Sequence, residues 1–350
     1  MIDHFLVQFP PGAAAVLEAA MEGGLGDGLP IIPPTREAVA RMLRAVRRAP
    51  ESSLGVMAPM MAEVTVEEAA LCAVAAGCLP EHFPVVVAAL EAIMDEEFNL
   101  LAIQATTELA SPLLIVNGPA AARLGVHGGS GCLGPGFRAN AAIGRAVRLA
   151  AMRLGGAIPG ETDMATFGHG GKFTACLAEN EAESPWEPLH VARGLRPAQS
   201  AVTLVGADPP VNVNDFASGG GEGVLRMIAE TMSYPGSNNA QGGGEVLVIA
   251  SPQHAQLLAR EGWGRRDVQE RLFELARVPM RRFSPEIAER VRGKRPWLFE
   301  KGGAGDAPVA DGPDSILIAV AGGPGSHTLF VPTYGETRAV TKPFAEERTA

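Results

Sequence analysis

One cysteine within a glycine-rich loop is the feature of this 350-residue chain with the clearest chemical potential. Cys132 lies in the segment HGGSGCLGPGFR (127–138), where glycines such as Gly129 and Gly131 let backbone N–H groups approach a ligand closely. The loop leads into a predicted helix, and a thiol near a helix N-terminus with arginines beyond it has surroundings that lower its pKa. We therefore predict that Cys132 is a nucleophile or redox thiol with a depressed pKa.

The helix after this loop carries arginines that an anionic ligand would explain. Arg138 and Arg145 are seven residues apart, so they lie almost on one line of a helix, and Asn140 lies close by in sequence. An arginine near a helix N-terminus opposes the helix dipole. We predict that Arg138, Asn140 and Arg145 bind a small, carboxylate-like substrate. A glycine-rich connection followed by a solvated arginine face is the alternative interpretation.

The same loop formally matches G-x-G-x-x-G over residues 129–134. A dinucleotide-binding loop should follow a strand directly, but about ten residues separate this one from the nearest apolar run, and Pro135 interrupts the glycines. The pattern therefore argues against a nicotinamide or flavin cofactor and leaves the cofactor undefined.

A second unusual region spans residues 156–195 and shows no convincing helical or strand period. Irregular segments of this length in compact domains are usually functional. His169 lies between glycines with little to pack against, which favours a catalytic acid or base, and Lys172 is the only lysine before Lys294. We predict that Lys172 contributes to substrate binding.

Helices and apolar runs alternate along the rest of the chain. Caps and apolar spacing predict helices over 13–22, 36–47, 66–77, 84–98, 265–277 and 285–291. Four continuous aliphatic runs predict buried strands in parallel or mixed sheets, at 113–116, 202–205, 246–250 and 316–321. Ligands of such sheets bind beyond the strand carboxyl ends, so we expect four residues to face a common crevice: Asn117, Asp208, His254 and His327.

These elements predict an α/β fold with mixed or parallel sheets and helices packed on their faces. We divide the chain into a mainly helical part (1–100), an α/β unit with the Cys/Arg loop and the long functional loop (101–200), and a second α/β unit (201–350). Nothing after Thr341 specifies a fold, so these residues are predicted to form a tail.

Composition fixes the broad class of protein. Hydrophobic residues make up 47% and charged residues 19% of the chain, which is typical of a well-packed domain. The net charge of −10 argues against nucleic acid as a partner, and no apolar run is long enough to span a membrane. The N-terminus resembles no export signal, so we expect a cytoplasmic protein whose four cysteines are free thiols.

Several motifs resemble those of a largely uncharacterised bacterial family. They are GDGLP…PPT (26–35), AAGCLPEHFPVV (75–86), QATT (104–107), NGP (117–119), GPGFRANAAIGRAVRL (134–149), GKFTACLAENEAESPW (171–186) and GGPGSHTLFVPT (322–333). Relatives in that family are associated with small thiol- or selenol-bearing UGSC proteins. The resemblance thus implies redox or sulfur chemistry and a heteromeric complex, without assigning a mechanism to any residue.

We arrive at three hypotheses. The first is an enzyme that acts on a small anionic substrate by thiol-dependent carbon–heteroatom bond cleavage or transfer, within a homo-oligomer or a heteromeric complex. Its catalytic residues would be Cys132, His169 and His327, and its substrate-binding residues Asn117, Gly129, Gly131, Arg138, Asn140, Arg145, Lys172 and His254. The second is a metal-dependent hydrolase or lyase with ligands from His169, Cys176, Glu179 and His327. The third is a non-catalytic binding or scaffold subunit.

Overall fold

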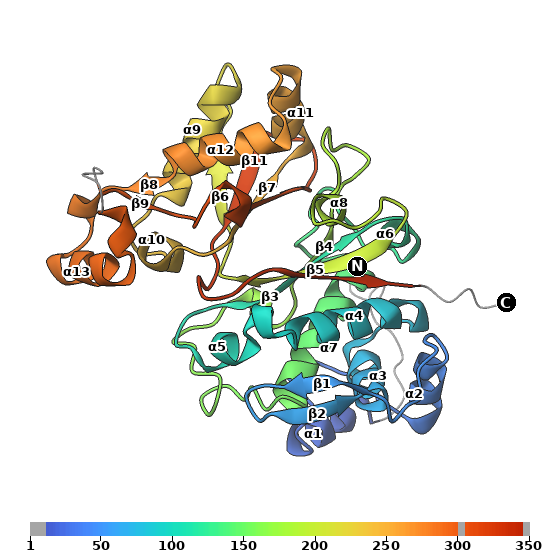
Figure 1. Ribbon diagram of the computed structural model, residues 1–350. Helices are drawn as coiled ribbons and strands as arrows, with labels where there is room; N and C mark the ends of the chain where they lie inside the picture. The colour runs from blue at the N-terminus through green and yellow to red at the C-terminus, as the bar shows by residue number, and fades with distance from the viewer. Residues whose placement is uncertain (1–11, 300–304, 346–350) are drawn as a thin grey trace, which may run out of the picture.

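Two four-stranded sheets lie face to face between two layers of helices (Figure 1). The computed structural model describes residues 12–299 and 305–345. The first sheet lies in the lower half of the view, and the second sheet lies above it. The predicted α/β class is confirmed, with both sheets mixed.

The first sheet has the strand order β12–β5–β3–β4. Its strands are β3 (Ser111–Asn117), β4 (Cys176–Ala178), β5 (Ser200–Ala207) and β12 (Val340–Phe344). Strands β3 and β4 are parallel, whereas β5 is antiparallel to both β3 and β12. The C-terminal strand β12 shows that residues beyond Thr341 are part of the sheet, so the predicted tail is wrong for residues 342–344.

The second sheet has the strand order β10–β7–β11–β6. Its strands are β6 (Val211–Asn214), β7 (Val246–Ala250), β10 (Ile316–Val320) and β11 (His327–Val331). Strands β10 and β7 are parallel, and β11 is antiparallel to β7 and β6. The first sheet takes β5 and β12 from beyond residue 199, so the two sheets interleave along the chain.

Alternating side chains explain why the aliphatic runs are continuous. In β3, Leu113 and Ile115 pack in one core with Leu247 and Ile249 of β7, between the two sheets. The intervening residue Leu114 packs against the helices of the first layer. Because each strand is covered on both faces, both sets of side chains are apolar. The predicted strand runs therefore correspond to β3, β5, β7 and β10.

The first sheet is covered by α3 (Val66–Ala76), α4 (Phe83–Ile93) and α7 (Arg138–Arg153). Helix α3 begins at a capping box between Thr65 and Glu68, as its sequence predicts. The outer elements of this half are α1 (Ala13–Glu22), α2 (Arg36–Leu43), β1 (Ser53–Met57), β2 (Ala62–Thr65), α5 (Leu100–Ala105), α6 (Ala120–Arg123) and α8 (Leu189–Ala192).

The second sheet carries α9 (Gly221–Met232), α11 (Pro252–Arg260) and α12 (Arg265–Leu275). Its outer elements are α10 (Asn238–Gly242), β8 (Arg277–Val278), α13 (Pro285–Lys294) and β9 (Ala307–Pro308). In the described part of the chain, no helix has the length and apolar character needed to cross a membrane.

The mixed topology separates two of the residues expected at one edge. Because β5 is antiparallel to β3, Ala207 pairs with Ser111, so Asp208 lies at the opposite edge from Asn117. The short strand β4 also lies within the region 156–195, for which no strand was predicted. Three residues are too few to show a period.

Candidate functional site

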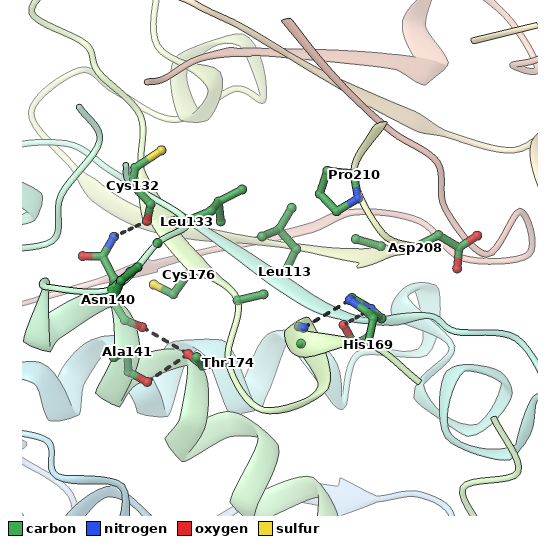
Figure 2. A pocket seen from close by; sticks show the side chains of 17 residues that line it. Leu113, Cys132, Leu133, Asn140, Ala141, His169, Thr174, Cys176, Asp208 and Pro210 are labelled. Atoms are coloured by element: carbon green, nitrogen blue, oxygen red, sulfur yellow. Dashed lines mark hydrogen bonds between the residues drawn. The ribbon is translucent and has the colours of Figure 1, made fainter. Parts of the chain in front are cut away.

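A cavity of about 550 Å³, here called the main cavity, lies beside β3 and β4. Cys132 and Leu133 contribute from the glycine-rich loop, His169 from the segment before β4, and Asp208 from the end of β5. Figure 2 shows Cys132 at one end of the cavity and His169 with Asp208 at the other, with Leu113 and Leu133 between them. The thiol and the His169 imidazole are therefore not a directly paired nucleophile and base.

A second cavity of about 280 Å³ shares Cys132 and Leu133 with the main cavity. Its other walls come from the loop Gly322–Gly325, from His327 at the start of β11, and from Ser251 after β7. The structure thus brings Cys132 into one cavity with His169 and into a neighbouring one with His327. The thiol lies where the two cavities meet.

Asn140 holds the glycine-rich loop in place. Its Oδ1 accepts the N–H of His127 at 2.8 Å, and its Nδ2 donates to the carbonyls of His127 and Cys132 at 2.9 and 3.0 Å. Gly128 passes so close to β4 that a Cβ there would lie 2.5 Å from the Ala178 carbonyl oxygen. Although Asn140 lines the main cavity, its amide is occupied by the loop, so it positions Cys132 instead of presenting a free group to substrate.

Burial determines the state of the Cys132 thiol. Burial raises its pKa, and backbone hydrogen bonds from Gly322, Cys132 and Leu133 oppose this without reversing it. The predicted depressed pKa is therefore wrong. Burial outweighs the backbone hydrogen bonds, and the arginines expected to stabilise the thiolate bond to Gly77 and Asp27 instead.

The other three cysteines have pKa values that burial raises more strongly. Burial raises the pKa of Cys72 and of Cys78 to about 12, and it raises that of Cys176 further. Within the described part of the chain, no backbone hydrogen bond lowers the pKa of any of these three thiols. Cys132 is thus the cysteine with the most favourable surroundings for a thiolate.

The two arginines predicted to bind substrate are used inside the fold. Arg138 donates twice to the Gly77 carbonyl, at 3.1 and 2.9 Å. Arg145 grips both carboxylate oxygens of Asp27, at 2.8 and 2.7 Å, and also donates to the carbonyls of Pro30 and Leu29. Neither arginine lines either cavity, so the structure does not support the prediction that they bind an anionic substrate. The anionic partner of Arg145 is a carboxylate 118 positions away in sequence.

His169 is held as a neutral hydrogen-bond donor. Its Nδ1 accepts the Gly171 N–H at 3.1 Å, which places the ring proton on Nε2, 3.2 Å from the Ser111 hydroxyl. Burial, then the charges of Lys172 and Arg148, lower the pKa of His169. The imidazole can therefore donate from Nε2 at neutral pH.

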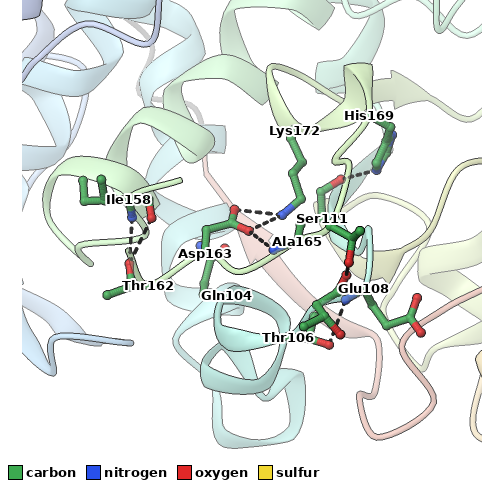
Figure 3. Close-up of polar contacts among 12 residues, drawn as sticks. Gln104, Thr106, Glu108, Ser111, Ile158, Thr162, Asp163, Ala165, His169 and Lys172 are labelled. Carbon is green, nitrogen blue, oxygen red and sulfur yellow. Dashed lines mark hydrogen bonds and ion pairs between the residues drawn. The ribbon is translucent and has the colours of Figure 1, made fainter. Parts of the chain in front are cut away.

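A buried ionic network lies behind His169 (Figure 3). Lys172 Nζ contacts both oxygens of Asp163, at 2.7 and 2.8 Å, and Arg148 lies 3.7 Å from the same carboxylate. Arg148 also donates to the Lys172 carbonyl at 3.0 Å and to Gln104 at 3.2 Å. The Lys172 ammonium group is therefore paired with Asp163, so the structure does not support the predicted role of Lys172 in substrate binding.

Asp208 is a carboxyl group of the main cavity whose pKa is strongly raised. Burial, then the charge of Glu108, raise its pKa to about 7. Its Oδ1 is buried, and no hydrogen-bond donor within residues 12–299 and 305–345 reaches it. The sequence placed Asp208 at a strand end but gave it no catalytic role, because its closeness to Glu108 depends on the antiparallel pairing of β5.

Asn117 and His254 line neither cavity and hydrogen-bond to other side chains. Asn117 donates to Glu179 at 2.6 Å and to Glu181 at 2.9 Å, and His254 is buried with its ring bonded to Thr328 at 2.9 Å. Both residues hold other parts of the fold together, so the structure does not support their predicted role in substrate binding.

His327 remains in the site, because it lines the second cavity. The Phe216 ring contacts it edge-on, with 5.0 Å between ring centroids. Its Nδ1 is buried and has no partner in the described part of the chain. An imidazole nitrogen that is free in a cavity next to a thiol is available for proton transfer.

The ligand set suggested for a metal ion is not assembled. Across the described residues, no three His, Cys, Asp or Glu side chains are grouped so that they could hold a metal ion. His169 and Cys176 line the main cavity, Glu179 is hydrogen-bonded between the sheets, and His327 lines the second cavity.

Comparison of the chain with protein-family models and with curated proteins gave no match.

Proposed function

We propose that this protein is an enzyme that cleaves or transfers a carbon–heteroatom bond through a covalent intermediate on Cys132. The observation that carries the proposal is the position of this thiol at the junction of two cavities, one of which holds Asp208 with a pKa raised to about 7. Strongly perturbed carboxyl groups in cavities are candidates for catalysis.

The reaction follows from the groups present. The Cys132 proton passes to the free nitrogen of His327, and the thiolate attacks an electrophilic carbon of the substrate. A C–S bond forms, the carbon–heteroatom bond breaks, and the leaving group takes a proton. Water or a second substrate then attacks the same carbon, which releases the product and returns the thiol.

Asp208 and His169 serve the far end of the substrate. A carboxyl group with a pKa near 7 is present in both protonation states at neutral pH, so Asp208 can give a proton to the departing part of the substrate where that part reaches the far end of the cavity, and can take one back from the acceptor that replaces it. The Ser111 hydroxyl, which lies 3.2 Å from His169 Nε2 and lines the cavity, can hydrogen-bond to a substrate oxygen at this end. The apolar side chains of Leu113 and Leu133 cover the part between the two ends.

The motif resemblance implies redox or sulfur chemistry, and an intermediate bound to the Cys132 sulfur agrees with that implication. The absence of a grouped ligand set among the described residues favours thiol chemistry over the metal-dependent alternative. A scaffold without catalysis gives no reason for a half-buried carboxyl group at Asp208 whose buried Oδ1 has no partner among the described residues, since such a group costs stability.

Covalent trapping tests the proposal. Wild-type protein and the Asp208→Asn variant are incubated with the small-molecule fraction of a bacterial extract, and the intact mass and cysteine peptides are then measured. We expect an added mass on Cys132 that accumulates in Asp208→Asn and is absent in Cys132→Ser. Adducts on the other cysteines alone, or no adduct in either protein, would contradict the proposed function.

A further inference from the structure

Two glycine-rich loops, one from each half of the molecule, form the walls of the second cavity. Residues 130–133 face the loop Gly322–Gly325. The loops are in close contact, because the Gly322 N–H donates to the Gly128 carbonyl at 2.8 Å and a Cβ on Gly323 would overlap the Ser130 hydroxyl. Gly323 has no room for a side chain, so its backbone lines this part of the cavity.

Several polar groups of the residues that line the second cavity have no hydrogen-bond partner among the described residues. Among the described residues, no acceptor takes the N–H of Gly131, Gly323 or Gly325. The buried Nδ1 of His327 is also unpartnered there. Of the residues in 12–299 and 305–345, none that lines the cavity is Asp, Glu, Lys or Arg. Gly131 is exposed and Gly323 and Gly325 are half-buried, so their N–H groups are open to a ligand, and one with acceptor oxygens can use all three.

We propose that the second cavity binds the carboxylate of the substrate whose reactive carbon meets Cys132; this inference rests on the proposed function. Backbone N–H groups in glycine loops hold anions through aligned dipoles. Once His327 has taken the thiol proton, its imidazolium faces the bound carboxylate. A dianionic phosphate would find no lysine or arginine in the lining, so the cavity favours a single negative charge.

The size of the second cavity fits the same assignment. Whole ligands usually occupy cavities of roughly 300–1,000 Å³, whereas this one measures about 280 Å³ and adjoins the main cavity of about 550 Å³. The carboxylate end fills the smaller space, and the body of the substrate lies against Leu113 and Pro210 in the larger one.

Two alkylating agents test whether the second cavity prefers a reagent with a carboxylate. Iodoacetate and iodoacetamide form the same C–S bond and release iodide, but only iodoacetate carries a carboxylate. Both react with the thiolate, so the ratio of their rate constants is independent of the Cys132 pKa. We expect this ratio at Cys132 to exceed that of glutathione by about tenfold, the effect of a single charge-assisted hydrogen bond.

The variants His327→Gln and His254→Gln form a matched pair at one edge of the second sheet. We expect His327→Gln to lower the ratio towards that of glutathione and His254→Gln to leave it unchanged, because His254 does not line the cavity and only supports the lining residue Thr328 from behind. A wild-type ratio equal to that of glutathione would overturn the carboxylate site and leave the reactive thiol standing. A high ratio that persists in His327→Gln would overturn the role of His327. If Cys132 reacts with neither reagent, the proposed function and this inference fail together.

Discussion

Replacing Asp208 by asparagine should stabilise the protein, and more so at higher pH. The pKa of Asp208 is raised from 3.8 to about 7, which is a difference of about three pH units. Each unit corresponds to about 1.4 kcal/mol, so the ionised carboxylate costs about 4 kcal/mol at pH 8. Because Asp208 Oδ1 has no donor within the described residues, the amide loses no hydrogen bond at that atom.

The sign of the pH dependence follows from the direction of this shift. The folded protein binds the Asp208 proton more tightly than the unfolded chain does, so its stability falls as the pH rises from about 4 to about 7 and is constant above that. We therefore expect Asp208→Asn to gain about 1.5 kcal/mol at pH 5 and about 4 kcal/mol at pH 8.

Urea unfolding at pH 5 and pH 8 measures both gains. Glu108→Gln is the matched control, because it removes the charge that raises the Asp208 pKa and leaves the Asp208 carboxylate in place; its gain at pH 8 should be smaller. An equal gain at the two pH values, or a loss of stability at pH 8, would show that Asp208 is not held in the unfavourable state on which its catalytic role depends.

Two further predictions concern the groups that support the site. Arg145→Ala should lower the free energy of unfolding by about 3–5 kcal/mol, because it leaves the buried Asp27 carboxylate unpaired; unchanged stability in urea would contradict the ion pair. Burial raises the pKa of Asp27, but the hydrogen bond and charge of Arg145 help to lower it below its usual value. The stabilisation by the Arg145–Asp27 ion pair should therefore be present above about pH 4 and be lost as the pH falls through the lowered pKa of Asp27. The His169 imidazole should titrate below 6.5 by NMR, and Lys172→Met should raise its midpoint; a wild-type midpoint at or above 6.5 would contradict the buried cationic surroundings.

Local signals in the sequence predicted the helices and the central strands. Thr65 and Glu68 define the start of α3, and the apolar run at 246–250 coincides with β7. Both depend on interactions within a few residues or on burial of whole segments. The strands β4 and β12 escaped prediction because they are short edge strands, fixed by pairing with β3 and β5.

The site depended on contacts that no local pattern reveals. Spacing along α7 predicted correctly that Arg138 and Arg145 lie on one helix, but their partners come from Gly77 and from Asp27, over 60 positions away. With the arginines engaged there, burial governs the Cys132 thiol. The glycine-rich loop nevertheless pointed to the junction of the two cavities, because glycines were needed for its close approach to β4.

The order in which the four cysteines react tests the central assignment most directly. The native protein is treated with a limiting amount of iodoacetamide near pH 8, and the labelled peptides are mapped by mass spectrometry. We predict that Cys132 is labelled first, because it lines both cavities and is the cysteine whose thiolate receives backbone hydrogen bonds. Labelling of Cys72, Cys78 or Cys176 ahead of Cys132 in the folded protein would contradict the assignment of Cys132 as the reactive thiol.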